Sequence, residues 1–454
     1  MITRPREWSA RSLALHLLLQ VRRKEAFVQE LLEESFREVS LSPPDRRLTT
    51  QLVCGVLRRR AALDALLRGV VTRSYNDVEP WLWEALRLGA FQLAYLSRMP
   101  AYSILHETVE LAVAFDQPRA KGFLNANLRS LTRLLTDDFL IAPSGAALPL
   151  EPGKYRRLAK SVMPDPKTVP VQYLSTAFSL PIWLAERWVK RWNADETARL
   201  GFWFAEPGPL WLRVNPLRTT RADFLAKLEQ ADCQARPGEH PQAVMLDDGA
   251  SIRELPGFAE GHFVVQDPSA MKVASALDPQ PGWRVLDLCA APGGKSTHLA
   301  ELMRDEGRVT SCDRDAARLQ PLRDTMERLG LRSITPTPIT TIPPAGPFDA
   351  ALVDVPCSNT GVLGKRPEVR WRLSEGELRR LIPQQSRLLA QACERVVPGG
   401  IVVYSTCSIE PEENVKVVQG VLAGLPEWRL EAEETSMPGM PSDGGYWARL
   451  RRRA

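Results

Sequence analysis

Two cysteines occupy positions in the sequence that suggest chemistry. Cys357 lies in DVPCSNTG, directly after the apolar run FDAALVD, and Cys407 lies in YSTCSIEPEEN, at the end of the run GIVVYSTC. Both runs are typical of buried strands. A single cysteine at a strand end is usually a small buried hydrophobic residue. Two of them at carboxyl strand ends are expected to face one pocket, where a thiolate could act as a nucleophile.

A glycine-containing turn upstream predicts a cofactor cradle. DLCAAPGGKSTHLAE ends an apolar strand and opens a helix at about Lys295, so backbone N–H groups there are free for a ligand. Its spacing matches neither the dinucleotide fingerprint nor the P-loop, which argues against NAD and ATP. Asp313, at the end of the next strand, is placed to accept hydrogen bonds from a ribose diol. A tight turn and a helix-capping aspartate would look the same in the sequence.

Two thiols beside a nucleoside-type cradle suggest methylation of a pyrimidine at C5. C5 is too weak a nucleophile to take a methyl group directly. Addition of a thiolate at C6 turns the ring into an enamine that can attack an activated methyl group. A base must then remove the C5 proton so that the thiolate can leave.

Three motifs carry a resemblance to a known family. CAAPGGK, DVPCSNTG with the downstream RPEVRWR, and YSTCSIEPEEN resemble the signature motifs of the RsmB/NOP2/Sun family of RNA cytosine-5 methyltransferases, which use S-adenosylmethionine. RVNPLRTTRADFLAKL and GHFVVQDPSA are similar to the module that precedes the methyltransferase domain in that family. The N-terminal helices resemble the NusB-like RNA-binding domain of the RsmB branch. The resemblance covers nearly the whole chain.

The resemblance implies roles for individual residues. Cys407 would be the C6 nucleophile and Cys357 the thiol that assists product release. DNA cytosine-5 methyltransferases instead use the cysteine of a Pro-Cys motif, so the reverse assignment stays open. The substrate would be contacted by Asp354, Pro356, Lys365 and Arg370. The S-adenosylmethionine site would be lined by Cys289, Ala290, Ala291, Pro292, Gly293, Gly294, Lys295, Asp313 and Asp354.

Two departures from the family pattern concern the cofactor and the Cys357 loop. SITPTPITTIPPAGP contains no carboxylate where the family often has one that meets adenine, and Asn359 stands where glycine is commoner. The loop GKRPEVRWR suits RNA contact, although a solvated charged loop with a packed Trp371 is the alternative. Glu413 and Asn414 are interpreted as first-turn helix residues. Arg58–Arg60 and Arg451–Arg453 are interpreted as solvated faces without a role.

The 454 residues are too many for one hydrophobic core, and the patterns divide them into parts. Apolar spacings of three and four predict an all-α, NusB-like domain over 1–137. Loss of that periodicity predicts a linker over 138–172, and mixed patterns predict a small α+β module over 173–268. Alternating strands and helices over 269–454 predict a doubly wound, Rossmann-like α/β methyltransferase domain.

Composition indicates the cellular compartment and the kinds of partner that we expect. The chain is 44% hydrophobic and 25% charged with a net charge of +5, which is ordinary for a globular protein and compatible with a polyanion. Seven cysteines without a C-x-x-C pair predict reduced thiols in the cytoplasm and no structural metal. No apolar run approaches the roughly 20 residues that span a bilayer, so no membrane association is expected.

The resemblance implies that the substrate is a cytosine of 16S ribosomal RNA, methylated before the small subunit is fully assembled. We expect the protein to act as a monomer. Two alternatives are an RNA-binding assembly factor in which methylation is secondary, and a methyltransferase of another RNA such as tRNA. The pair Cys357 and Cys407 argues against the assembly factor, because a scaffold needs neither thiol.

Overall fold

The computed structural model describes residues 4–5, 7–22, 27–96, 98–247, 251–339, 346–439 and 441–454. It forms two compact units, and one of them is discontinuous in sequence. The first comprises the chain up to Pro207 together with Leu363–Ser374, and the second comprises Gly208–Val362 and Glu375–Ala454. Among the described residues, no helix combines the length and the apolar composition needed to cross a membrane.

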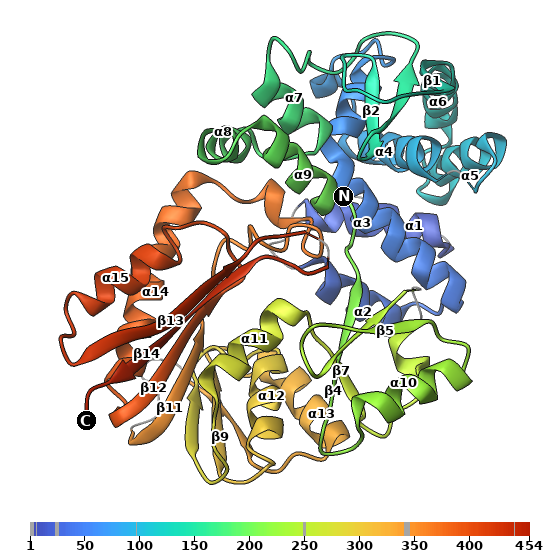
Figure 1. Cartoon of the computed structure of the whole chain (residues 1–454). Helices are drawn as coiled ribbons and strands as arrows, with labels where there is room; N and C mark the ends of the chain where they lie inside the picture. The colour runs from blue at the N-terminus through green and yellow to red at the C-terminus, as the bar shows by residue number, and fades with distance from the viewer. Residues whose placement is uncertain are drawn as a thin grey trace. The chain divides into compact units, whose positions relative to one another are not determined.

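The first unit begins with a helical bundle, as predicted. Its apolar faces meet in a core that includes Leu17, Leu63, Leu86 and Leu128, each fully buried. The longest helix, α3, starts behind the N-cap Ser42 with two prolines in its first turn, where their missing N–H groups cost nothing. The bundle helices are α1 (Ala10–Val21), α2 (Val28–Glu38), α3 (Pro43–Arg68), α4 (Pro80–Tyr95), α5 (Ala101–Ala114) and α6 (Lys121–Leu134) (Figure 1).

The predicted linker over 138–172 is wrong, because much of this segment is folded. Strands β1 (Leu135–Leu140), β2 (Ala147–Glu151) and β3 (Lys154–Leu158) form an antiparallel sheet in the order β1-β3-β2. Leu148 and Leu158 are buried on its inner side, and the Arg156 guanidinium donates to the Leu93 carbonyl of α4 over 3.0 Å. The helical period is lost here because the segment forms strands.

The boundary predicted at 172/173 also differs from the structure. Helices α7 (Pro170–Ala177), α8 (Ile182–Arg191) and α9 (Ala194–Phe204) belong to the first unit. The Ser179 hydroxyl, between α7 and α8, accepts a hydrogen bond from the Ala61 N–H of α3 over 3.0 Å. The second compact unit therefore starts at Gly208.

The second unit opens with a small module. An antiparallel sheet in the order β5-β6-β4-β7 packs on one helix through Phe224 and Leu228, as an α+β arrangement predicts. Arg213 of β4 and Glu301 of the following domain form a fully buried ion pair at 2.8 Å, which joins the module to the larger sheet's helix layer. The elements are β4 (Leu210–Val214), α10 (Arg221–Gln230), β5 (Ala235–Pro237), β6 (Ala243–Leu246) and β7 (Phe263–Val265).

A seven-stranded sheet forms the rest of the second unit. Its order is β10-β9-β8-β11-β12-β14-β13, and only β14 runs antiparallel to its neighbours β12 and β13, which confirms the doubly wound α/β prediction. The strands are β8 (Arg284–Asp287), β9 (Arg308–Asp313), β10 (Ile334–Pro338), β11 (Phe348–Asp354), β12 (Val396–Thr406), β13 (Trp428–Ser436) and β14 (Gly445–Arg452).

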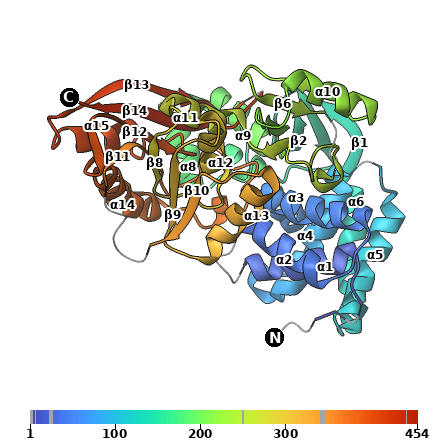
Figure 2. The same ribbon diagram turned by 90° about the horizontal axis from the view of Figure 1, so that it is seen from below.

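Helices cover both faces of this sheet (Figures 1 and 2). Along β11, Ala350 and Leu352 face one apolar core while Ala351 and Val353 face the other, which is the two-residue period of a strand buried on both sides. One face carries α11 (Pro268–Leu277), α12 (Gly294–Leu302) and α13 (Gln320–Leu329), and the other carries α14 (Glu375–Cys393) and α15 (Val415–Leu422).

Candidate active site

Most of the site residues predicted from the sequence gather at the carboxyl edge of the large sheet, whereas Lys365 and Arg370 belong to the first unit. The strand order reverses between the neighbouring parallel strands β8 and β11, so the loops that follow them diverge above the sheet. β12 pairs with β11 in a register that sets Ser405 beside Asp354. The loops after β8, β11 and β12 therefore meet at one edge.

The two thiols that end β11 and β12 are in contact. The Sγ atoms of Cys357 and Cys407 lie 3.3 Å apart; neither cysteine forms a disulfide, and both are half-buried. The hydrogen bond with Cys407 raises the pKa of Cys357 well above its ordinary value, and burial and the charge of Glu413 raise it further. Cys357 therefore stays a thiol at neutral pH. The structure brings together the two cysteines that the sequence placed 50 residues apart.

The structure shows why Asn359 can stand where glycine is commoner in the family. Its φ of 57° lies in the left-handed region, which favours glycine but which asparagine also adopts. Its side-chain amide donates to the Cys357 carbonyl over 2.7 Å, and its Oδ1 accepts from the Cys407 thiol over 3.1 Å. The asparagine thus keeps the turn and adds a contact to both cysteines.

Lys295 and Asp354 form an ion pair beside the thiols. The ammonium lies 2.6 Å from Asp354 Oδ2, and the Ser405 hydroxyl donates to Oδ1 over 2.8 Å. Burial lowers the pKa of Lys295, but Asp354 raises it more, so the net shift is upward and the lysine is charged. The charge of Cys407 acts on Lys295 in the same direction, so the ammonium and a Cys407 thiolate attract each other.

The loop after β8 has the backbone features of a cradle. Gly293 has φ 110°, and the Ala290 N–H donates to the Cys312 carbonyl of β9 over 2.8 Å. A Cβ on Gly293 would lie 2.5 Å from the Leu322 side chain, whereas one on Gly294 would meet only Gln266 at 3.6 Å. Substitution of Gly293 therefore disturbs packing, and Gly294 is the better position for testing a ligand.

Asp287, at the end of β8, was not predicted as a site residue. Its Oδ2 accepts from the Ser296 hydroxyl over 2.6 Å, while its buried Oδ1 has no hydrogen-bond partner. Burial raises the pKa of Asp287 to about 7. The orphaned oxygen beside the glycine turn fits a ligand that brings a donor or a positive charge. The sequence signal was an aspartate at a strand end just before the turn.

Asp313 ends β9, as predicted, and is nearly buried. Its Oδ1 accepts from the Asp315 N–H over 3.2 Å, and Arg318 lies 3.4 Å from it. The carboxylate thus stabilises the turn that follows β9 and also lies at the sheet edge. Residues 340–345, in the segment without a carboxylate after β10, lie outside the described residues.

Arg370 is not at this edge and does not face solvent. It is 1% exposed, and its guanidinium donates to the carbonyls of Arg58, Phe178, Phe204 and Leu363, all in the first unit. Burial lowers its pKa to about 9. The predicted substrate contact by Arg370 is therefore corrected to a structural role. Arg58, interpreted as a solvated cation, is also buried and donates to the Gly364 carbonyl over 2.7 Å.

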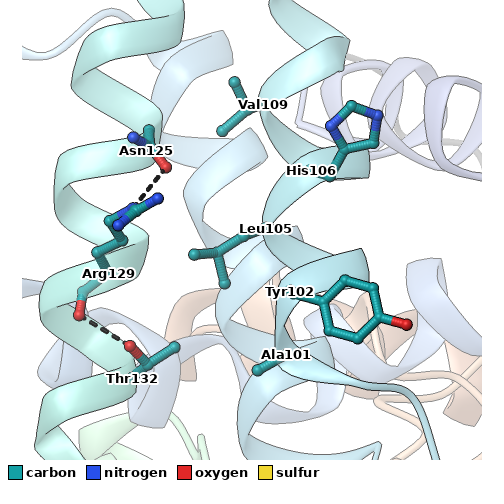
Figure 3. Close-up of a pocket in the computed structure, with 8 residues that line it drawn as sticks. All are labelled: Ala101, Tyr102, Leu105, His106, Val109, Asn125, Arg129 and Thr132. Atoms are coloured by element: carbon teal, nitrogen blue, oxygen red, sulfur yellow. Dashed lines mark hydrogen bonds between the residues drawn. The ribbon is translucent and has the colours of Figure 1, made fainter.

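A hollow of about 490 Å³ lies between α5 and α6, away from every predicted site residue (Figure 3). Leu105 and Val109 point towards α6, where the Arg129 guanidinium donates a hydrogen bond to the Asn125 side chain.

In the described part of the chain, no cluster of three or more His, Cys, Asp or Glu side chains could hold a metal ion.

A doubly wound sheet with a glycine cradle at its switch point, and two thiols at the same edge, defines a methyltransferase. Comparisons agree: residues 274–444 match the 16S rRNA methyltransferase RsmB/F family, residues 9–133 the NusB family, and residues 180–253 the ferredoxin-like domain of RsmF/B-like methyltransferases. The chain belongs to the RsmB/F family of 16S rRNA methyltransferases.

Full-length relatives support this assignment. The chain is 36% identical over 437 residues to the probable ribosomal RNA small subunit methyltransferase B of Synechocystis, covering 95% of this chain and 92% of that protein. It is 32% identical to ribosomal RNA small subunit methyltransferase B of Klebsiella pneumoniae, covering 98% of each. The crystal structure of PH0851 has the same fold, with a TM-score of 0.77 and 24% identity over 99% of this chain and all of that one.

Proposed function

We propose that the protein transfers a methyl group from S-adenosylmethionine to C5 of a cytosine in 16S ribosomal RNA, through a covalent adduct with Cys407. The observation that carries the proposal is the 3.3 Å contact between Cys407 and Cys357 at the sheet edge that also holds the glycine cradle. One thiol alone would be explained by packing. Two in contact, beside a half-buried Lys–Asp pair, supply a nucleophile and a second proton-bearing group.

S-adenosylmethionine would supply an electrophilic methyl group. The turn from Cys289 to Lys295 would approach it through backbone, Asp313 would accept from its ribose, and Asp354 would lie between it and the base. The orphaned Asp287 Oδ1 adds an acceptor at the same place. In a titration calorimeter, Gly294→Val should lose cofactor affinity with an unchanged melting temperature; unchanged affinity would count against this site.

Cys407 would act as the thiolate that bonds to C6, which makes C5 nucleophilic. The Lys295 ammonium stabilises that thiolate, and the Asp354 carboxylate holds the lysine in place. After C5 takes the methyl group, a base removes the C5 proton, the electrons of that C–H bond form the C5–C6 double bond, and the C6–S bond breaks. Cys357, still a thiol, would donate a hydrogen bond to the departing Cys407 thiolate and so assist release.

The RNA substrate is proposed from the family and the relatives, whose names refer to ribosomal RNA of the small subunit. We propose free 16S rRNA before full subunit assembly, with the target base turned out of its helix to reach Cys407. Mapping of 5-methylcytosine in ribosomal RNA with and without the gene tests the substrate. Loss of the mark from tRNA alone would replace 16S rRNA with tRNA.

Separate removal of each thiol tests the mechanism. Cys407→Ala should lower the methylation rate by about three orders of magnitude or more and should form no RNA adduct. Cys357→Ala should accumulate a protein–RNA complex that survives denaturing gel electrophoresis when substrate RNA and S-adenosylmethionine are present. An adduct with Cys407→Ala and none with Cys357→Ala would exchange the two roles. No adduct in either variant or in trapped wild type would contradict the covalent mechanism.

A further inference from the structure

A buried polar cluster lies behind the two cysteines and is not explained by the mechanism above. Its centre is the side chain of Glu413, on the loop between β12 and α15. Glu413 Oε1 accepts from the Ser358 N–H over 2.8 Å and from the Gln385 amide over 2.9 Å, and Oε2 accepts from the Ser358 hydroxyl. Ser358 directly follows Cys357, so the carboxylate holds the loop that carries this thiol.

The same cluster holds the other cysteine loop. Ser408 directly follows Cys407, and its hydroxyl lies 3.1 Å from the hydroxyls of Ser358 and Thr360. The Ile409 N–H donates to Thr360 Oγ1 over 3.1 Å. The hydroxyls of Ser358 and Ser408 therefore belong to residues next to a thiol, and each bonds to a residue on the opposite loop.

This polar cluster is buried, so its side chains lose their hydration when the protein folds, which costs free energy. Thr360, Gln385, Ser408 and Glu413 are fully buried, and Ser358 is 2% exposed. A buried carboxylate costs several kcal/mol unless hydrogen bonds compensate for the lost water. Burial raises the pKa of Glu413, and the bonds from Ser358, Ser408 and Gln385 oppose that shift. Apolar side chains would fill the same space without this cost, so packing alone does not explain the choice of residues.

We propose that Glu413 is the positioning residue that sets the separation and orientation of Cys357 and Cys407 through Ser358 and Ser408. This inference rests on the proposed function, because a release thiol is useful only at a defined distance from the nucleophile. Glu413 makes its hydrogen bonds to Ser358 and Gln385 and not to either sulfur, so these bonds act on the thiols through geometry. Its charge also raises the pKa of Cys357. An error of about 1 Å in such a placement is expected to slow a reaction by up to about 100-fold.

The backbone at Glu413 is held independently of its carboxylate. The Tyr404 hydroxyl donates to the Glu413 carbonyl over 2.6 Å, and the Thr406 hydroxyl donates to Asn414 Oδ1 over 2.6 Å. The Gly361 N–H also donates to the Cys407 carbonyl over 3.0 Å. Removal of the Glu413 side chain should therefore loosen the two thiols while the β12–α15 connection keeps its course.

Three variants test the proposal. Glu413→Ala removes the acceptor, Glu413→Gln keeps the shape and an acceptor oxygen, and Glu412→Ala is the matched control, because Glu412 pairs with Lys416 at the exposed side of the same segment. Single-turnover assays on substrate RNA would measure formation and decay of the protein–RNA adduct. Glu413→Ala should slow adduct decay at least about tenfold, Glu413→Gln should recover most of the loss, and Glu412→Ala should match wild type.

Thiol chemistry separates positioning from general destabilisation. If Glu413 orders the two loops, Glu413→Ala should change the ratio of iodoacetamide alkylation rates at Cys357 and Cys407, and Glu413→Gln should restore it. An unchanged ratio and an unchanged adduct decay would overturn the proposal, even if the melting temperature fell. If Glu413→Ala does not fold, Ser408→Ala, which removes one hydroxyl from the same cluster, decides by the same two readouts. Absence of adduct and 5-methylcytosine in wild type would instead refute the proposed function.

Discussion

Residues 354–362 and residues 363–374 follow one another in the chain, yet they belong to different units. The first stretch stays at the sheet edge, where Cys357 contacts Cys407. The second is built into the helical unit, where the Trp371 indole donates to the Leu57 carbonyl over 2.9 Å and Arg60 lies over its ring. Two consecutive stretches of one loop therefore belong to different compact units.

The comparison teaches that cations around an aromatic residue do not by themselves indicate RNA contact. Arg370 lies in such a stretch of sequence, but its guanidinium donates to backbone carbonyls. These carbonyls take the hydrogen bonds that the guanidinium could otherwise donate to an RNA phosphate. Arg366 lies over the Phe27 ring of the same unit, at 4.7 Å from the ring centroid. Of the substrate contacts predicted in this loop, the one by Lys365 remains a proposal, and this residue is half-buried.

The largest expected effect comes from removing the helical partners of residues 363–374. A chain that starts at residue 170 lacks Leu57 and Arg58, so Arg370 and Trp371 lose buried acceptors and packing. We expect this chain to aggregate or to lose cooperative unfolding, measured by circular dichroism. Replacement of 363–374 by a Gly-Ser linker of the same length should restore solubility and cofactor binding to the truncated chain. Equal cooperative melting of the truncated and full-length chains would break the comparison.

A smaller effect is expected from single substitutions in the second stretch. Arg370→Ala leaves buried carbonyls unsatisfied and should lower the free energy of unfolding by about 3 kcal/mol or more, measured in urea. Lys365→Ala should change it by about 0.5 kcal/mol or less but should weaken RNA binding and reduce its salt dependence. The comparison is contradicted if Arg370→Ala weakens RNA binding while the stability stays at the wild-type value.

The first stretch can be tested through the pH dependence of thiol alkylation. Because the bond with Cys407 is the main cause of the raised pKa of Cys357, Cys407→Ala should lower that pKa. The midpoint of Cys357 alkylation by iodoacetamide, followed by mass spectrometry, should then move to lower pH. Cys233, which lies on the α+β module, is the internal control for reagent reactivity. A midpoint that stays in place would show that Cys407 does not control Cys357.

A pH-dependent effect is expected from Asp287, a buried carboxyl group that lacks the full set of partners found around Arg370. Because burial raises its pKa to about 7, the folded chain holds a proton between about pH 4 and 7 that the unfolded chain has released. This contribution to stability is therefore lost as pH rises towards 7. Asp287→Asn should flatten the dependence in that range, and the exposed Asp324→Asn should not. Identical curves for wild type and Asp287→Asn would contradict the assignment.

The sequence predicted those features that depend on local pattern and on general rules of topology. Alternating strands and helices predicted the doubly wound sheet, and carboxyl strand ends predicted that Cys357 and Cys407 would meet. It did not predict the sheet over 135–158, because three short strands rich in polar residues resemble a linker. The end of the first unit at Pro207 was missed because the packing of α7–α9 on α3 leaves no mark in composition.

Glu413 and Arg370 show what only the tertiary structure decided. The sequence predicted a first-turn helix carboxylate for one and a cation in a charged loop for the other. In the structure Glu413 precedes Asn414, the N-cap of α15, and Arg370 is buried. Their functions depend on partners far away in the chain: Ser358 lies 55 residues from Glu413, and Arg58 lies 312 residues from Arg370. A charged side chain is buried only where such partners replace its water, and that arrangement exists only after the chain has folded.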